Sequence, residues 1–321
     1  RTAAFKVIPG STVTWQNINV LTTQVLQSGS VIADSRGLVT IPGVQILTGS
    51  GNRLVLNAAF TAPTVQSPIG AALLQTPLIS WSASNGAASY EVWISNLSTG
   101  QNPVIQTTVS STNMTAANPL GIGRYRVWVR GKSSSGACTA WSAPSDFQIT
   151  TRVVIDNLPT TFSGTAVISW AALPGAVKYD LWVDNLSSGQ QQVVRQAALT
   201  TNSYQLPGNL PLGKYAVWVR GIDAGGNGAY WSLAKQFNIT PATIILSPTG
   251  PGFNMQPVFR WQALPGATGY QLFVRDLVTN AIALNPVNVS ATSYTPASSL
   301  PSSDYRWWVR ASNNQGLIGA W

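Results

Sequence analysis

Histidine is absent from this chain of 321 residues, and acidic residues are few. Asp and Glu together number 9, with Glu91 the single glutamate, and charged residues occupy 8% of positions. Without histidine the chain lacks the usual general acid or base near neutral pH and any imidazole metal ligand. Paired-carboxylate chemistry would depend on scattered aspartates. We therefore expect a protein that is not an enzyme and that uses no metal or other cofactor.

Cysteine and long apolar runs are also scarce. Cys138 is the only cysteine, and one thiol forms neither an internal disulfide nor a multi-thiolate metal site. No apolar run is long enough to span a bilayer, so we expect no membrane insertion, and the start at Arg1 suggests a mature or trimmed chain. The polar composition favours an exported protein, located outside the cell or at the cell surface.

The net charge of +9 arises because 18 Lys and Arg face so few acids. Nucleic-acid binding depends on clustered cations that displace counterions. The densest basic segment, Arg124 to Lys132, holds four basic residues in nine positions and forms no basic tract. We expect no nucleic-acid partner.

What the chain does contain is an internal repeat. Trp81, Trp170 and Trp261 lie 89 and 91 residues apart, and a tyrosine follows each of them nine residues later. A Tyr-x-x-Trp-Val-Arg segment then recurs, and sixteen residues after its tyrosine another tryptophan follows. The three segments begin at Tyr125, Tyr215 and Tyr305, and the later tryptophans are Trp141, Trp231 and Trp321.

The repeated segments alternate apolar and polar residues, which is the pattern of β-strands with one buried face. They are short and separated by Gly, Pro, Asn and Ser, so each copy predicts an antiparallel β-sandwich of about seven strands. The predicted fold is all-β: a strand at 1–9, a small β module at 10–60, and sandwiches at 61–150, 151–240 and 241–321. In the small module we expect strands at 11–20, 31–33, 38–41 and 53–57.

At these residues the chain resembles the fibronectin type III family. The resemblance rests on the early tryptophan of each copy, a Gly-Ala-x-x-Tyr segment before the third strand, and a leucine five residues before a strand-opening tyrosine. It covers about residues 61–321. It implies tandem sandwiches in which Tyr125, Tyr215 and Tyr305 make tyrosine-corner contacts. The family defines a fold better than a function, since its modules serve as spacers, adhesins and receptors.

The third copy differs from the others at its end. Phe147 follows Trp141 by six residues and opens a closing strand, and Phe237 follows Trp231 in the same way, whereas Trp321 is the last residue of the sequence. The pattern of that closing strand, Phe then polar then aliphatic, recurs at residues 4–8, which include Phe5, Val7 and Ile8.

Three explanations of this match remain open. The N-terminal strand completes the last sandwich of another copy, or the chain is one unit of a longer tandem polypeptide, or the match is accidental. We favour the first, in which Phe5, Val7 and Ile8 form the donated strand beside Trp308, Arg310 and Trp321. It predicts a structural subunit that polymerises with itself, head to tail, into a bacterial surface or extracellular filament.

The alternative function is a glycan-binding adhesin, or a spacer region of a larger secreted protein. Outward-facing aromatic and arginine residues of the first two repeats motivate it. They could form a glycan platform or subunit contact, or a structural ladder of stacked Arg and Trp, which we favour. This candidate binding face consists of Trp93, Trp128, Arg130, Trp182, Trp218 and Arg220.

The aspartates of the second repeat do not have the spacing of a calcium loop. Asp180, Asp184 and Asp223 fall on different predicted elements. We expect them to be scattered, solvated carboxylates.

Overall fold

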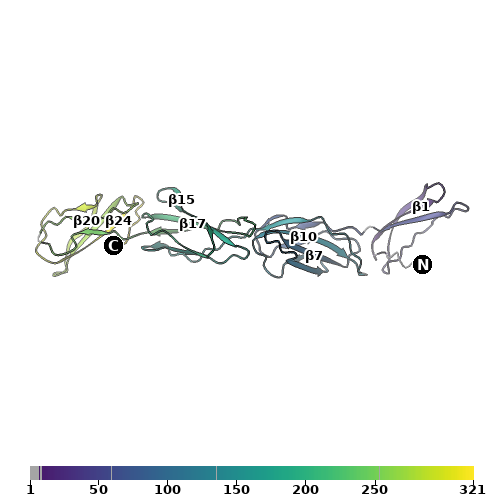
Figure 1. The fold of residues 1–321 in the computed structure, drawn as a ribbon, viewed down its shortest axis with the longest axis horizontal. Helices are drawn as coiled ribbons and strands as arrows, with labels where there is room; N and C mark the ends of the chain where they lie inside the picture. The colour runs from purple at the N-terminus through teal and green to yellow at the C-terminus, as the bar shows by residue number, and fades with distance from the viewer. Residues whose placement is uncertain (1–6, 8, 59, 135, 253) are drawn as a thin grey trace. The chain divides into compact units, whose positions relative to one another are not determined.

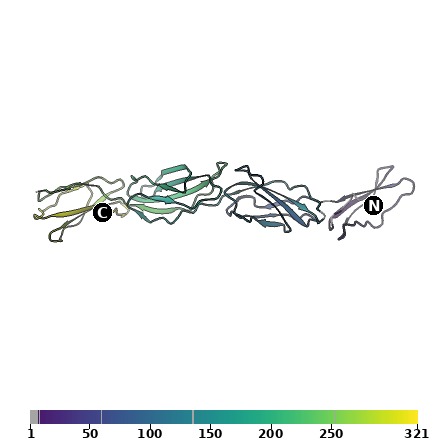
Figure 2. The same ribbon diagram turned by 60° about the horizontal axis from the view of Figure 1, so that its bottom comes forward.

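The structure is a computed structural model that describes residues 7, 9–58, 60–134, 136–252 and 254–321. Every regular element in these ranges is a β-strand, as Figures 1 and 2 show from two sides. The predicted all-β class is confirmed. Among the described residues there is no helix of the length and apolar character needed to cross a bilayer.

The small module is a three-stranded antiparallel sheet of order β2-β1-β3, formed by β1 (Thr12–Asn19), β2 (Val25–Ile32) and β3 (Asn52–Ala58). Val7, Val13 and Ala33 form its buried cluster. Gly37 has φ of 73°, and a Cβ there would collide with the carbonyl oxygen of Val7. The turn at this point therefore requires glycine.

Two predicted strands of this module are corrected by the structure. The second begins at Val25 and not at residue 31, and residues 38–41 form no strand. Hydrogen bonds from side chains, and not strand pairing, hold this long loop. The Asp34 carboxylate accepts the amide protons of Arg36 and Leu38, and the side-chain oxygen of Gln27 accepts that of Gln45. Local hydrogen bonds of this kind compete with strand pairing.

The first repeat is a sandwich of two sheets with orders β4-β6-β9 and β5-β11-β10-β7-β8. The central strands β7 and β10 lie side by side (Figure 1), and Trp93 is paired with Trp128. The strands are β4 (Val65–Ser67), β5 (Gly70–Ala72), β6 (Leu78–Trp81), β7 (Ser89–Asn96), β8 (Ile105–Val109), β9 (Asn113–Thr115), β10 (Gly123–Lys132) and β11 (Ser145–Ile149).

The second repeat follows the same plan, with sheet orders β13-β16 and β12-β18-β17-β14-β15. Its strands are β12 (Thr161–Phe162), β13 (Val167–Ser169), β14 (Lys178–Asn185), β15 (Gln190–Leu199), β16 (Ser203–Gln205), β17 (Gly213–Ile222) and β18 (Lys235–Ile239).

The third repeat has two three-stranded sheets, β19-β20-β23 and β22-β21-β24. Its strands are β19 (Ile245–Ser247), β20 (Phe259–Trp261), β21 (Gly269–Asp276), β22 (Ile282–Val289), β23 (Ser293–Tyr294) and β24 (Tyr305–Ser312). Within the described ranges, no strand matches β11 or β18.

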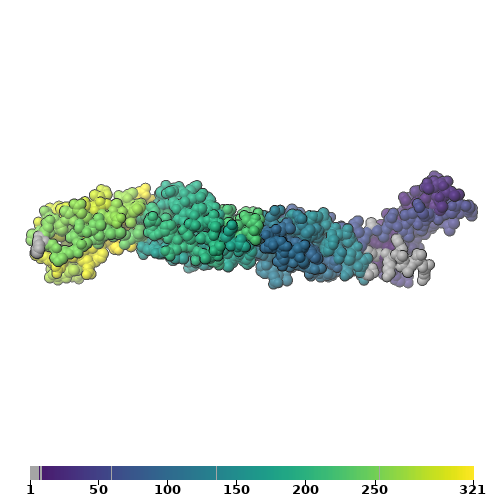
Figure 3. All heavy atoms as spheres, viewed as in Figure 1, coloured from purple at the N-terminus to yellow at the C-terminus, as the bar shows by residue number. Residues whose placement is uncertain are grey.

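Each sandwich is held by its inward-facing side chains. The early tryptophan packs edge-on or tilted against the tyrosine nine residues later, with ring centroids 5.4 to 5.6 Å apart. Figure 3 shows all heavy atoms of the chain as spheres, from the side seen in Figure 1. The tyrosine corner is present in every copy, because the hydroxyls of Tyr125, Tyr215 and Tyr305 each donate to a carbonyl oxygen four residues upstream.

The chain divides into two compact units. One comprises residues 1–151 with 223–227, and the other comprises residues 152–222 with 228–321. The groove and the main aromatic hollow described below both belong to the second unit.

Candidate functional site

The first repeat shows what a closing strand contributes to this sandwich. β11 pairs with β10 so that Phe147 lies opposite Tyr125 and Ile149 lies opposite Gly123. The rings of Tyr125 and Phe147 stack with centroids 5.4 Å apart and planes at 17°. Phe147 and Ile149 are almost wholly buried, so the closing strand supplies part of the hydrophobic core.

The second repeat reproduces this arrangement. Phe237 of β18 lies opposite Tyr215 of β17, and the two rings stack at 5.6 Å and 17°. The second apolar residue of the strand, Ile239, is also buried. The register of the closing strand is therefore a repeated feature of the fold.

In the third repeat, β24 pairs with β21 along one edge only, and no described residue pairs with its other edge. A groove of about 740 Å³ lies there. It is lined by loop residues together with residues of β24 and of the opposite sheet, among them Pro248, Phe259, Leu300, Asp304, Tyr305 and Trp307. We call it the acceptor groove. It occupies the side of the sandwich on which β11 and β18 lie in the other repeats.

Two enlarged core residues line this groove. Phe259 stands where the other copies have Ile79 and Ile168, and Trp307 stands where they have valine. The Trp307 ring lies 5.0 Å from that of Phe259, and its indole N–H donates to the Pro248 carbonyl at 3.0 Å. Trp307 is 9% exposed. These rings replace part of the apolar volume that the closing strand provides elsewhere.

The predicted acceptor residues Trp308, Arg310 and Trp321 are not at this groove. Trp308 and Arg310 face away from the core, where Trp308 contacts Phe273 and Arg310 stacks on Trp321 at 4.2 Å. None of the three lines the groove. Tyr305 and Trp307 line it instead, because alternate residues of a strand point to opposite faces.

On the donor side, Phe5 and Ile8 lie outside the described residues. Val7 is described, and it is buried beside Val13 and Ala33 of the small module.

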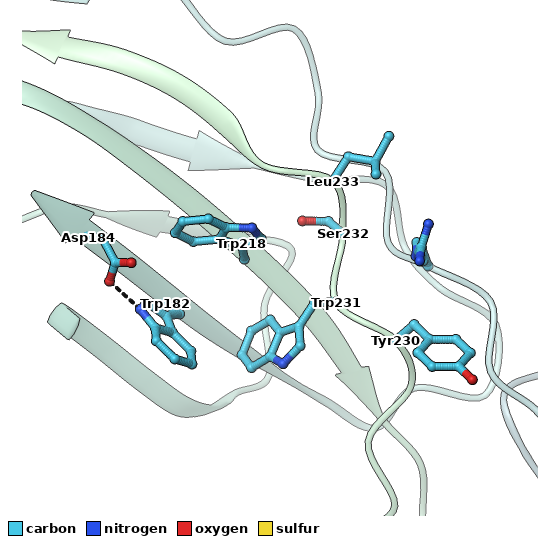
Figure 4. A pocket seen from close by; sticks show the side chains of 8 residues that line it. Trp182, Asp184, Trp218, Tyr230, Trp231, Ser232 and Leu233 are labelled. Carbon is cyan, nitrogen blue, oxygen red and sulfur yellow. Dashed lines mark hydrogen bonds between the residues drawn. The ribbon is translucent and has the colours of Figure 1, made fainter. Parts of the chain in front are cut away.

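The aromatic face of the second repeat is an open hollow of about 430 Å³ (Figure 4). Trp182 of β14 and Trp218 of β17 come from paired strands, and Trp231 comes from the following loop. The Trp182 indole N–H donates to Asp184, as the dashed line in Figure 4 shows. The other lining residues are Arg152, Tyr230, Ser232 and Leu233.

A cation–π ladder backs this hollow. Arg195 lies over the rings of Trp182 and Trp231, at 5.1 and 5.2 Å from the centroids, and Arg220 lies 4.6 Å from Trp231. One oxygen of Asp180 accepts from both arginines at 2.7 to 3.1 Å. The observed contacts thus agree with the ladder interpretation of Trp182 and Arg220.

The first repeat has a similar hollow of about 340 Å³, lined by Trp93, Asn102, Trp128 and Trp141. The Trp93 indole N–H donates to the Asn102 side-chain oxygen at 2.7 Å. Arg130 stacks on Trp141 at 4.6 Å and forms an ion pair with Glu91.

The expectation of solvated aspartates in the second repeat was wrong for two of the three. Asp180 and Asp223 are 1% and 2% exposed. Asp180 is held by its two arginines, and Asp223 caps its own loop by accepting the amide proton of Asn227 at 2.8 Å. Spacing alone carried no information on burial. Among the described residues, no group of acidic, Cys or His side chains is arranged to hold a metal ion.

Solved structures that are similar to the chain include the following two. One contains the FN1–FN3 domains of chicken CNTN1, with 14% identity, coverage of 81% of this chain and 95% of that one, and a TM-score of 0.27. The other is a segment of two fibronectin type III domains from chicken tenascin, with 13% identity, coverage of 56% and 98%, and a TM-score of 0.39. No family model and no curated protein matches the sequence. The assignment of fibronectin type III-like sandwiches rests on the strand order and register described above.

Proposed function

We propose that the chain is a structural subunit of a fibre in which the N-terminal segment of one copy adds as a strand to β24 of the next. The observation that carries this proposal is the acceptor groove along the unpaired edge of β24. An edge strand beside an open groove is a template for strand addition. Because donor and acceptor lie in different parts of the chain, the contact is head to tail and generates a filament. On the composition of the chain, we place this fibre on a bacterial surface or in the extracellular space.

The register of the closed repeats defines how the donated strand would pair. Transferred from β10 and β11, it sets Phe5 opposite Tyr305 and Lys6 opposite Asp304. Phe5 would then stack on Tyr305 as Phe147 stacks on Tyr125. Ala3 would lie opposite Trp307, so that a small residue meets the enlarged one.

Charge favours this particular pairing. Lys6 and Asp304 have opposite charges, whereas the matching cross-strand pairs of the first two repeats join Arg124 to Gln148 and Lys214 to Asn238. Asp304 is exposed, and within the described part of the chain its carboxylate has no ion pair or hydrogen bond. A cross-strand pair of opposite charges contributes about 0.2–1 kcal/mol. The acidic residue thus stands on the repeat in which no described strand takes the place of β11 or β18.

The enlarged core supports a subunit that folds before it assembles. A sandwich waiting for a strand from another copy must keep its core covered in the meantime. Phe259 and Trp307 provide that cover. Val7 is already buried in its own module, so we assign residues 3–6 to the pairing and keep Val7 as the point at which the donated segment joins its module.

Deletion and charge reversal test the proposal. Removing residues 1–6 should abolish filaments in electron micrographs and leave a soluble monomer. Lys6→Asp and Asp304→Lys should each raise the critical concentration for assembly about fivefold, the equivalent of about 1 kcal/mol. The double variant should restore it. Lys214→Asp is the matched control, because it changes the same strand position in a repeat that is already closed.

Two results would overturn the proposal. Filaments that still form without residues 1–6 would exclude strand donation. Covalent multiples of the 34.0 kDa chain, in mass spectra of fibre under denaturing conditions, would show that the following segment of one polypeptide fills the groove. If the deletion blocks assembly but the charge reversals have no effect, donation stands and the assigned register is wrong.

A further inference from the structure

The hollow on the aromatic face of the second repeat contains more than the ladder explains. The ladder accounts for Trp182 and Trp231, whose rings stack with arginines. No described guanidinium lies over Trp218, whose ring packs edge-on with that of Trp182 at a centroid distance of 6.3 Å. In the first repeat, by contrast, Arg126 lies over the matching Trp128 at 5.9 Å. Trp218 is partly exposed and lines the hollow. A large ring held at a fixed angle, with part of its surface open to solvent, offers a stacking platform.

The orientation of the neighbouring ring is fixed by the protein itself. The indole N–H of Trp182 is taken up by Asp184, which also accepts the amide proton of Gln192. Trp93 of the first repeat is fixed in the same way by Asn102, whose oxygen also accepts from Ser95. Both hollows are thus preorganised, and preorganisation lowers the entropic cost of binding.

Polar groups around the rings remain available. Among the described residues, the indole N–H groups of Trp218 and Trp231 have no hydrogen-bond acceptor, and neither is buried. Arg152 stacks on Tyr230 at 5.8 Å without an acidic partner, and the second oxygen of Asp184 has no donor. The hollow therefore presents aromatic faces edged by hydrogen-bond donors and one acceptor.

We infer that these hollows bind the pyranose rings of a neutral glycan. A sugar ring has apolar C–H faces that stack on indole and a rim of hydroxyls that both donate and accept. A volume of about 430 Å³ lies in the range of small-molecule sites, about 300–1,000 Å³. A purely apolar ligand would leave the indole N–H groups and Arg152 without partners, at a cost in affinity.

The charge of the lining selects a neutral ligand over an ionic one. In the second repeat Arg152 and Asp184 offset each other, and in the first repeat the lining holds only the neutral Asn102 beside its rings. Each hollow by itself suits sugar rings of such a glycan, but in the first repeat Arg126 lies over Trp128 at 5.9 Å, whereas no described guanidinium lies over the matching Trp218. Because the second hollow has more polar groups, it should bind the more tightly.

The inference is tested by isothermal titration of the full chain with neutral hexasaccharides of glucose, mannose, galactose and N-acetylglucosamine. High salt in the buffer suppresses non-specific attraction to a chain of net charge +9. At least one hexasaccharide should bind, and Trp218→Ala should weaken that binding at least tenfold. Trp128→Ala should have a smaller effect. Trp308→Ala is the matched control, since it removes the ring at the same strand position of the third repeat.

Trp218→Phe separates stacking from hydrogen bonding, because it keeps an aromatic face and loses the N–H. We expect it to retain more affinity than Trp218→Ala. The inference is overturned if none of the four hexasaccharides binds. It is also overturned if the Trp128→Ala/Trp218→Ala double variant still binds while its backbone hydrogen-exchange pattern shows that its fold is unchanged. It is also overturned if only charged polymers bind and high salt abolishes their binding, because the attraction between polymer and chain would then be electrostatic.

Discussion

The second and third repeats share their early tryptophan, their tyrosine corner and their central strand pair, but they differ on one side of the core. In the second, β18 covers Tyr215 with Phe237, and both residues are fully buried. In the third, that side is a groove, and Tyr305 is partly exposed. The inward residues differ accordingly, with Val217 in one and Trp307 in the other.

This difference shows how one strand determines the residues behind it. A closing strand brings a phenylalanine and an isoleucine into the core, so the neighbouring strand carries a small valine. In the third repeat, where no described strand takes that place, the same position carries an indole that donates to the carbonyl of Pro248, next to β19. Close packing requires that the side chains between the two sheets fill the available space in both repeats.

The largest expected effect comes from removing the phenylalanine ring of the closing strand in the second repeat. Phe237→Ala removes a ring that stacks on Tyr215 and contacts Phe162. A buried phenylalanine changed to alanine costs about 3–5 kcal/mol. Hydrogen exchange resolved by segment should show loss of protection across β14, β17 and β18, while the first repeat keeps its own. Leu233→Ala, in a loop of the same repeat and 73% exposed, should change stability by less than about 0.5 kcal/mol.

If Phe237→Ala left the exchange of β17 unchanged, the closing strand would not be part of the core. The enlargement of Trp307 would then need another explanation.

Exchanging the two inward residues between the repeats should lower the free energy of unfolding of both repeats. Trp307→Val should destabilise the third repeat by about 3 kcal/mol, because the groove would extend into the core. Val217→Trp should destabilise the second repeat by about 1–3 kcal/mol, since Phe237 already occupies the space. Segment-resolved hydrogen exchange measures both. Trp308→Val, one residue further along β24 and facing outward, is the control for loss of an aromatic ring.

A Val217→Trp protein as stable as the parent would show that the second repeat has room for both residues. The proposed volume match between closing strand and inward residue would then fail.

Much of this architecture could be predicted from the sequence, because its signals are local and repeated. Alternation in Tyr125 to Arg130 predicts which side chains face inward, and Val127 and Val129 are indeed fully buried. The recurring spacing of tryptophan and tyrosine predicts pairs that meet in the core, and they do. The fold class followed from these patterns alone.

The groove lining and the buried aspartates could not be predicted in this way, because they depend on contacts between distant segments. In the sequence, Trp307 is one apolar residue among others. Its role became visible only in the structure, where its indole N–H donates to the Pro248 carbonyl and no described strand pairs with the second edge of β24. Asp180 gains its burial from Arg195 and Arg220, which lie on two different strands. The sequence indicated the groove lining in one way only: tryptophan stands at position 307, where the first two copies have valine.

The smallest expected effect concerns alkaline pH. Burial raises the pKa of Tyr125 to about 12, and burial also raises that of Tyr215 above its usual value of 10.0. A raised pKa means that the folded protein holds the phenol in its neutral form. The resulting stability is complete below about pH 10, where both states are protonated, and it declines as pH rises through the folded pKa, because the unfolded chain ionises first.

The free energy of unfolding of the first two repeats should therefore fall between about pH 10 and pH 12. That of the third should fall least, because no strand among the described residues covers Tyr305. Urea unfolding of the full chain at about pH 8 and about pH 11, followed by phenolate absorbance, measures the difference. Tyr215→Phe should lower the free energy of unfolding by about 1 kcal/mol at the lower pH, since the Tyr215 hydroxyl donates to the Pro211 carbonyl. At the higher pH the variant should resist urea better than the parent, because it has no phenol to ionise. If Tyr305→Phe gave the same gain, the closing strand would have no part in burying the tyrosine of the corner.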